Sequence, residues 1–196
     1  MQDRDIAAFD RRAGGYEEGR IGQWHQRVAE RVAGVALQAA PEPARVLDVG
    51  CGTGMLLRLL AARWPEARLL AGLDAAPGMI RAGSPVTSAE FVLGGAERLP
   101  FRSGCFDLVV STTSFDHWND QGRGLRECAR VLRPGAPLVL CDLFSPLLLP
   151  TLWFGGRQDK ARTRRRAEKL LHSAGFTSPQ WHRDLLVKTV VTRARG

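Results

Sequence analysis

The sequence predicts an α/β fold: a seven-stranded, mostly parallel sheet with an antiparallel last strand and helices on both faces. The first observation is an alternation of short, β-rich apolar runs with longer stretches of helical periodicity, which is typical of βαβ units. The second is a glycine-rich segment at residues 50–54, between one such run and a helical stretch, where doubly wound sheets bind ligands. The length of 196 residues fits a single domain.

The expected elements follow one another with short connections. Apolar residues at helical spacing predict a first helix over residues 24–39, which Pro41 and Pro43 end. A turn at Arg133-Pro134-Gly135 precedes the fifth strand, and Gly175 ends the last helix. We expect strands at 45–49, 68–74, 90–93, 106–111, 137–143, 180–184 and 186–192, and further helices at 55–63, 77–82, 122–131 and 162–173.

Composition argues against several classes of protein. The longest apolar stretch, 138–154, is interrupted by a charge and two prolines, so no run reaches the roughly 18–20 residues of a membrane span. The charged residues 1–5 argue against a secretory signal. The four cysteines form no C-x-x-C pair, so we expect neither a metal centre nor disulfides. These features predict a cytoplasmic protein with reduced thiols.

Positive charge is concentrated in one segment. Lysine and arginine exceed aspartate and glutamate by 28 to 20, and seven of the 28 lie within residues 157–169. Such a cluster binds nucleic acid, an acidic partner or an anionic substrate, or it is a solvated helix face. Apolar residues share the opposite face of the expected helix. An amphipathic surface helix needs no ligand, so nucleic acid is not the partner we expect.

The spacing of the glycine-rich segment discriminates between ligands. Its glycines allow a tight turn and a close approach of the backbone to a ligand. The segment reads G-x-G-x-G from Gly50 to Gly54, one residue shorter than the dinucleotide pattern G-x-G-x-x-G. Asp48 just before it adds negative charge, which disfavours a pyrophosphate and suits a ligand with an ammonium and a sulfonium. Taken alone, the glycines are also compatible with a plain strand-to-helix turn.

Polar residues follow the other expected strands. Asp74 ends the second strand, where a carboxylate can accept hydrogen bonds from both ribose hydroxyls. It can also cap the helix expected from residue 77, and the two roles are compatible. Residues 94–101 follow the third strand and residues 111–118 follow the fourth. Because the carboxyl ends of parallel strands meet at one edge of a sheet, we expect these segments to surround one ligand.

Together, these segments resemble the class I S-adenosylmethionine-dependent methyltransferases, in particular the type 11 group that includes ubiquinone/menaquinone-biosynthesis C-methyltransferases. The resemblance implies a Rossmann-like fold in one domain, with S-adenosylmethionine as cofactor and S-adenosylhomocysteine as product. It implies an N-terminal lid within residues 1–40, a cofactor-binding core over 43–143, and a substrate cover, helix and last two strands over 144–196. The matching segments are 46–54, 73–74 with Met79, 96–101, 106–111 and 127–135.

The resemblance also implies how the cofactor would be held. Asp48 would hold the methionine ammonium, Asp74 would bind the ribose, and Tyr16 would cover the methionine part from the lid. The family commonly has Asp before Ala96, where it bonds the adenine amino group, whereas this chain has Gly95. The implied cofactor-binding set is Tyr16, Asp48, Gly50, Cys51, Gly52, Gly54, Asp74, Ala75, Met79, Gly95, Ala96, Glu97, Ser111 and Thr112.

A histidine after the fourth strand is the candidate general base. Methyl transfer needs the nucleophile held in line, about 3–3.5 Å from the methyl carbon, and only some acceptors must also lose a proton. A neutral imidazole at His117 can take that proton, and Asp116 is the second candidate. The alternative is that His117 and Trp118 only form the pocket wall. His25 on the first helix either faces the substrate or is a surface residue.

The sequence leaves the acceptor and the assembly open. We expect a small molecule with an oxygen, nitrogen or carbon nucleophile as the substrate. The apolar segment 143–154 would line a pocket for it, pack under the N-terminal helix, or form a contact between the subunits of a homodimer. One alternative is an RNA- or protein-modifying methyltransferase that uses the basic segment 157–169. Another is a non-catalytic homologue that keeps the cofactor site, to which Gly95 gives some weight.

Overall fold

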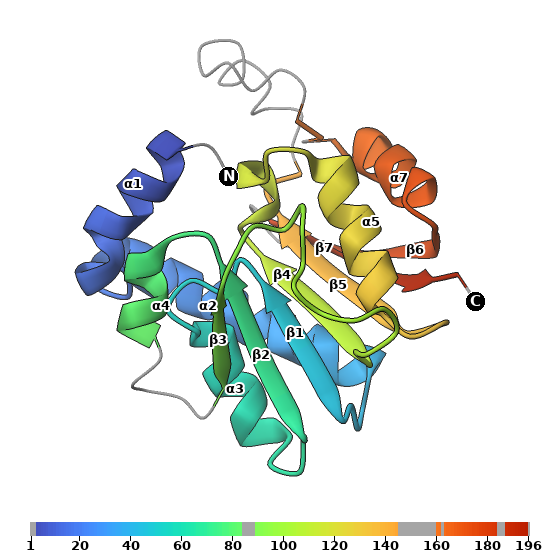
Figure 1. The fold of residues 1–196 in the computed structure, drawn as a ribbon, viewed down its shortest axis with the longest axis horizontal. Coiled ribbons are helices and arrows are strands. Elements are labelled where there is room, and N and C mark those ends of the chain that lie inside the picture. The colour runs from blue at the N-terminus through green and yellow to red at the C-terminus, as the bar shows by residue number, and fades with distance from the viewer. Residues whose placement is uncertain (1–2, 84–88, 145–159, 162, 184–186, 196) are drawn as a thin grey trace.

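The sheet has the predicted number of strands, and the strands run in the predicted directions. The computed structural model describes residues 3–83, 89–144, 160–161, 163–183 and 187–195. Seven strands form one sheet in the order β3-β2-β1-β4-β5-β7-β6 (Figure 1). Strands β1 to β5 are parallel, and β7 runs antiparallel to both β5 and β6. The strands are β1 (Arg45–Val49), β2 (Leu69–Asp74), β3 (Glu90–Leu93), β4 (Leu108–Thr112), β5 (Pro137–Asp142), β6 (Phe176–Arg183) and β7 (Lys188–Ala194).

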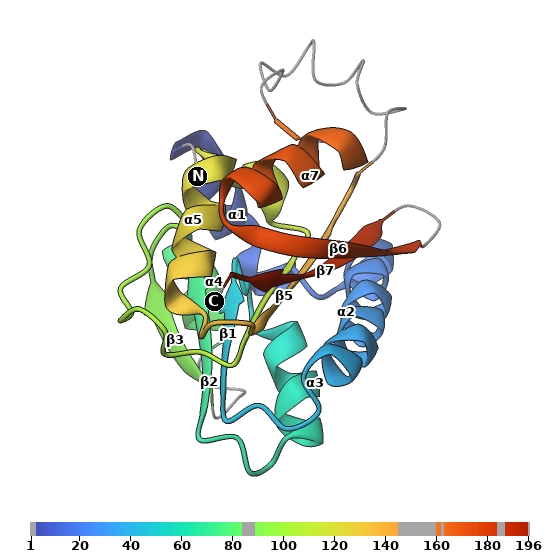
Figure 2. The ribbon, with the colours of Figure 1, turned by 90° about the vertical axis from the view of Figure 1, so that its right-hand side faces the viewer.

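Helices cover both faces of the sheet, as predicted. Figure 2 shows α2 (Gly19–Ala39) and α3 (Met55–Arg63) on one side of the strands and α5 (Gln121–Val131) on the other. Helix α7 (Arg164–Ser173) packs beside α5. The shorter elements are α1 (Asp3–Arg12), η1 (Ala13–Gly15), α4 (Pro77–Gly83) and η3 (Phe115–His117). None of the described helices is long and apolar enough to cross a membrane.

The alternation of side chains along each strand builds a core on each face. On β1, Val46 packs in the cluster with α2 and α3, whereas Leu47 and Val49 pack in the cluster with α5 and α7. Strands buried on both faces are apolar along their whole length, which is why the sequence predicted β1 and its neighbours so closely. Strand β1 pairs with β2 on one side and β4 on the other, so it lies where the strand order reverses.

Two of the predicted element boundaries were wrong. Strand β6 begins at Phe176, not near residue 180, and it continues through Pro179. An edge strand tolerates proline, and here the register shifts between Thr177 and Gln180, with Ser178 at a φ of 53°. Helix α2 begins five residues earlier than expected, at Gly19 instead of residue 24, and α1 precedes it within the segment interpreted as a lid.

Candidate functional site

The glycine-rich loop folds against the ends of β2 and β4. The amides of Gly50 and Cys51 both donate to the carbonyl of Leu73, at 2.7 and 3.1 Å. Gly50 has a φ of 77°, and a Cβ atom there would overlap the hydroxyl of Ser114. Ser114 Oγ in turn donates to the carbonyl of Val49 at 2.9 Å. The glycine is therefore required both by the backbone conformation and by the close approach of the loop after β4.

Asp74 fixes the other side of this loop. Its Oδ2 accepts from the amide of Gly52 at 2.9 Å, and its Oδ1 accepts from the amide of Ala76 at 2.8 Å. Burial raises the pKa of the carboxyl group, while these backbone donors act in the opposite direction. Asp74 thus closes the turn that leads into α4, which begins at Pro77, and it does not bond an amide inside that helix. Its ribose-binding role stays a prediction, and Asp74 lines the hollow shared with Gly95 and Ala96 in which that role would be played.

Two buried polar atoms in the site have no hydrogen-bond partner among the described residues. They are Oδ1 of Asp48 and Oγ1 of Thr112. Asp48 is only 1% exposed, and burial, followed by the charge of Asp74, raises its pKa to about 8. Both residues line one hollow together with Tyr16 and His25. Because an unpaired buried polar group costs folding energy, such a pair indicates a ligand that completes it.

Three adjoining hollows lie at the carboxyl ends of the strands, and Gly50 lines all three. Their volumes are about 50, 30 and 20 Å³. Of the predicted residues, Gly54, Ser111 and Asp116 line none of the three; Asp116 instead donates its amide to Asp142 at 3.1 Å. Those that do line them are Tyr16, Asp48, Gly50, Cys51, Gly52, Asp74, Ala75, Met79, Gly95, Ala96, Glu97, Thr112 and His117.

The N-terminal segment covers these hollows. The Tyr16 ring meets His25 edge to face at 4.9 Å, and burial raises its pKa to about 12. Phe9 meets the His117 ring in the same manner, with centroids 5.0 Å apart. Figure 1 shows α1 beside α4, at the ends of the strands. The N-terminal segment therefore lies over the strand ends, and its role as a lid stays a prediction.

Three anchors of the lid were not predicted. Glu17 accepts from Arg58 Nη2 with both carboxylate oxygens at 2.7 Å, and from the hydroxyl of Thr53 at 2.5 Å. Asp10 accepts from the amide of Gly78 at 2.5 Å. A Cβ atom at Gly22 would overlap the backbone of Glu17, so the lid turns tightly into α2. The hydrogen-bond donors to Glu17 and Asp10 lie 36 to 68 residues away in sequence, and no local sequence pattern indicates such pairs.

The neighbourhood of Gly95 is occupied by another acidic residue. A Cβ atom at Gly95 would lie 2.9 Å from Oε2 of Glu97. The other oxygen, Oε1, accepts from the amides of Asn119 and Asp120 at 2.5 and 3.3 Å. A carboxylate therefore lies beside the position where the family resemblance implies Asp, although it comes from two residues further along the chain.

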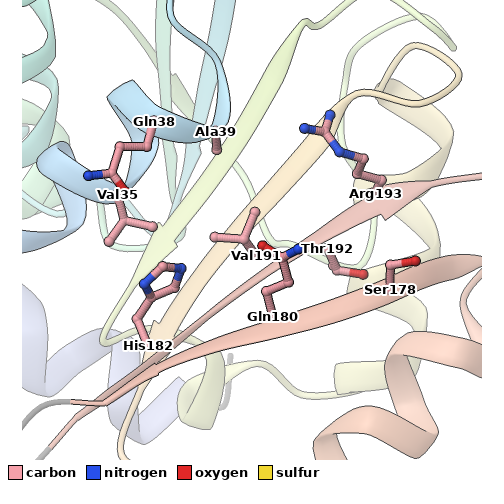
Figure 3. A pocket seen from close by; sticks show the side chains of 9 residues that line it. All are labelled: Val35, Gln38, Ala39, Ser178, Gln180, His182, Val191, Thr192 and Arg193. Carbon is pink, nitrogen blue, oxygen red and sulfur yellow. The ribbon is translucent and has the colours of Figure 1, made fainter.

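A separate hollow lies between α2 and the β6–β7 pair (Figure 3). Its volume is about 170 Å³, larger than those at the strand ends, and two of its polar side chains are hydrogen-bonded within the protein. Thr192 Oγ1 donates to the carbonyl of Thr177 at 2.7 Å, and Arg193 donates to the carbonyl of Gly135 at 3.0 Å. None of the predicted cofactor-binding or catalytic residues lines it. Volume alone therefore points to a different region from the one that the predicted residues line.

The basic segment is only partly a solvated face. On α7, Ala167 and Leu171 are buried, as the amphipathic pattern predicted. Arg164 pairs with Glu168 at 2.8 Å. Lys160 is 6% exposed and donates to the carbonyls of Trp118 and Asn119, so it does not belong to a solvated face. Residues 145–154 of the predicted substrate cover and residues 157–159 and 162 of the cluster lie outside the described residues.

Within the described part of the chain, no cluster of three or more His, Cys, Asp or Glu residues has the arrangement of a metal site. The four cysteines are free thiols.

Comparisons with known proteins agree with this geometry. A family described as "Methyltransferase domain" matches residues 47–140. A malonyl-[acyl-carrier protein] O-methyltransferase of Herminiimonas arsenicoxydans is 35% identical over 96% of this chain and 75% of its own length. The demethylmenaquinone methyltransferase of Thermotoga maritima is 36% identical over 63% of this chain and 52% of its own.

The fold is shared with solved structures at lower identity. The methyltransferase in a complex with the Haloferax volcanii activator Trm112 superposes with a TM-score of 0.78 at 22% identity, over 96% of this chain and 98% of the other. The chain spans about half to two thirds of the length of most curated relatives that it matches. What those longer proteins act on therefore does not transfer to it without an experiment.

Proposed function

Because the chain belongs to the type 11 family of class I S-adenosylmethionine-dependent methyltransferases, we propose that it transfers the methyl group of S-adenosylmethionine to a small-molecule acceptor. One observation carries the proposal: Asp48 and Thr112 line a hollow beneath the N-terminal segment, and each has a buried oxygen with no hydrogen-bond partner among the described residues. A ligand with an ammonium group supplies the missing donors and the charge that stabilises an ionised Asp48.

The other lining residues suit the rest of this cofactor. Asp74 would accept from ribose hydroxyls, with Ala75 and Met79 beside the base. The third hollow has backbone and small side chains at Gly95 and Ala96, against which the adenine would lie. Asp48, Asp74 and the glycine loop fit a cation and a nucleoside better than they fit a pyrophosphate, because two carboxylates in one site repel phosphates.

The cofactor supplies an activated methyl group on a sulfonium, so this chain needs to hold the acceptor in line and exclude water. The hollow lined by Phe9, Thr113 and His117 is where we place the acceptor. Thr113 has a φ of 51°, a conformation that a β-branched residue rarely adopts and that is typical of functional sites. His117 would accept the proton of the nucleophile.

This assignment favours an acceptor whose nucleophile carries a proton, such as a hydroxyl or a hydroquinone ring. A carboxylate, the acceptor suggested by the malonyl-[acyl-carrier protein] relatives, is already ionised at neutral pH and needs no base. The overlap of the demethylmenaquinone relatives with this chain supports the first class. Methyl transfer to an acceptor that carries a proton therefore requires His117, whereas methyl transfer to a carboxylate does not.

The test is methyl transfer from methyl-labelled S-adenosylmethionine to a naphthohydroquinone and to a malonyl thioester, with wild type and His117→Gln. We expect label in the hydroquinone, and a loss of about 100-fold or more in rate for His117→Gln. Label in the malonyl thioester alone, at equal rates in both proteins, would contradict the acceptor class and the base. Label in neither acceptor but in added RNA would favour the RNA-modifying alternative.

A further inference from the structure

His117 faces a carboxylate that belongs to the lid. Oδ2 of Asp5, on α1, lies 3.5 Å from Nδ1 of His117, on η3. The side chains are 14% and 26% exposed, so water screens this pair less than it screens a surface pair. We infer that Asp5 is a positioning residue that orients the His117 imidazole and stabilises its protonated form when the lid is closed. This inference rests on the proposed role of His117 as a base.

Helix α1 presents two groups to the same ring. Asp5 and Phe9 are four residues apart, so they lie one turn apart on one face of the helix. Phe9 meets the His117 ring at 5.0 Å with an interplanar angle of 87°, which limits the rotation of the imidazole. Asp5 then faces one edge of a ring whose plane is already set. Orientation and charge thus come from the same helical turn of the lid.

The position of α1 is fixed independently of this pair. Asp10 accepts from the amide of Gly78 at 2.5 Å, and a Cβ atom at Gly78 would lie 2.7 Å from the Asp10 carboxylate. The close approach of α1 and α4 therefore depends on that glycine. Because Asp10 anchors the helix, removal of the Asp5 charge need not displace the lid. This separates a positioning role for Asp5 from a merely structural one.

Other ionisable groups surround the pair and act on both forms of the ring. On α1, Arg4 Nε lies 3.8 Å from Oδ1 of Asp5, the oxygen other than the one near His117. Asp74 and Tyr16 line the same hollow as His117, and Asp142 on β5 accepts the amide of Asp116, the residue before it. The carboxylate of Asp5 lies 3.5 Å from a nitrogen of the ring itself.

The chemical consequence is a defined proton route. A carboxylate at Nδ1 favours the tautomer with its proton on Nδ1, so Nε2 is the basic nitrogen. As the acceptor oxygen bonds to the methyl carbon, its proton passes to Nε2, and the electron pair of the broken carbon–sulfur bond stays on sulfur. Asp5 remains ionised and stabilises the imidazolium that results.

The first test needs neither cofactor nor acceptor. In protein labelled at its four histidines, NMR follows the titration of the His117 resonances, assigned through His117→Gln. We expect Asp5→Asn to move the titration midpoint of His117 to lower pH by about half a unit to one unit, because an attractive charge is lost. Asp10→Asn is the matched control: it removes one charge from the same helix but keeps an oxygen for Gly78.

An unmoved midpoint in Asp5→Asn, or an equal shift in Asp10→Asn, would overturn the inference. Asp5→Glu is the second variant: it keeps the charge, so we expect the midpoint to remain near that of wild type. These outcomes are independent of methyl transfer. If the chain methylates no acceptor while the Asp5→Asn shift is present, the proposed function fails and the interaction of Asp5 with His117 stands.

A kinetic test follows once the acceptor is found. We expect Asp5→Asn to lower kcat about 5- to 50-fold with little change in the KM for S-adenosylmethionine, and to move the acid limb of the pH–rate profile to lower pH. Asp5→Asn combined with His117→Gln should be no slower than His117→Gln alone. Additive losses, or a loss confined to KM, would assign Asp5 to lid anchoring instead.

Discussion

The hollows at the strand ends and the hollow between α2 and the β6–β7 pair differ most in their polar groups. The second is the larger, at about 170 Å³ against about 50 Å³ for the largest of the first three. Yet the two buried oxygens that lack a partner in the described part of the chain, Asp48 Oδ1 and Thr112 Oγ1, both belong to the strand ends. The proposed ligand site therefore rests on buried polar groups and on the segment that covers them, and not on volume.

The largest effect is expected where the strand-end region depends on one glycine. In Gly50→Ala, the new methyl group would overlap Ser114 at a φ of 77°. We expect a loss of about 2–4 kcal/mol in the free energy of unfolding and no measurable S-adenosylhomocysteine binding, by urea denaturation and calorimetry. Gly34→Ala is the control, since nothing lies within 4 Å of its Cβ position in α2. It should be stabilising by roughly 0.5–1 kcal/mol, and equal losses in both variants would contradict the account.

The strand-end region should also make stability depend on pH. The pKa of Asp48 in the folded chain, about 8, lies above its ordinary value of 3.8, so the folded state keeps a proton that the unfolded state releases. The stabilising contribution is complete below pH 3.8 and is lost as pH rises through about 8. Chemical denaturation across this range should show wild type losing stability relative to Asp48→Asn. Parallel curves for the two proteins would show that Asp48 titrates normally.

A smaller effect is expected from the lid anchor. Glu17→Gln removes the charge that faces Arg58, but the two side chains are 39% and 28% exposed, so solvent screens the pair. We expect a loss of less than about 1 kcal/mol in stability and a few-fold faster release of S-adenosylhomocysteine, measured by stopped-flow tryptophan fluorescence. Glu18→Gln, at the neighbouring exposed position, is the control. Identical release rates in wild type and Glu17→Gln would mean that the anchor does not hold the lid.

The smallest effect is expected in the other hollow. Gln180→Ala widens the hollow between α2 and the β6–β7 pair without contact with the strand ends. Its affinity for S-adenosylhomocysteine should stay within about twofold of wild type, because surface substitutions rarely reach 0.5 kcal/mol. A tenfold loss of affinity, measured by calorimetry, would mean that the cofactor binds in this hollow and not at the strand ends.

The sequence predicted the parts of the molecule that local rules determine. Strand β1 and helix α3 have the predicted bounds, because a doubly buried strand and the glycines after it leave few alternatives. The lid contacts could not be predicted. Glu17 accepts hydrogen bonds from Arg58, which lies 41 residues away in sequence. Asp10 accepts one from the amide of Gly78, which lies 68 residues away. Contacts of this kind depend on tertiary packing, which leaves no periodic pattern in the sequence.

Tertiary packing also accounts for the errors at the edges. Strand β6 passes through Pro179 because its outer edge needs no ladder donor there, a fact that depends on the strand order. Lys160 was grouped with a basic surface, yet it is buried because two backbone carbonyls accept its ammonium. In both cases the conformation depends on contacts with another part of the sheet or with its loops, which are distant in the sequence.

Isothermal titration of S-adenosylhomocysteine into wild type, Asp48→Asn and Gln180→Ala tests the central claim most directly. We expect binding by wild type and Gln180→Ala, and affinity at least about 30-fold weaker in Asp48→Asn, because the amide cannot neutralise the ammonium. Asp48→Asn should remain folded, since it removes an unpaired buried carboxyl. Wild-type binding that Asp48→Asn leaves unchanged, or no binding by wild type at millimolar ligand, would contradict the assignment of this site.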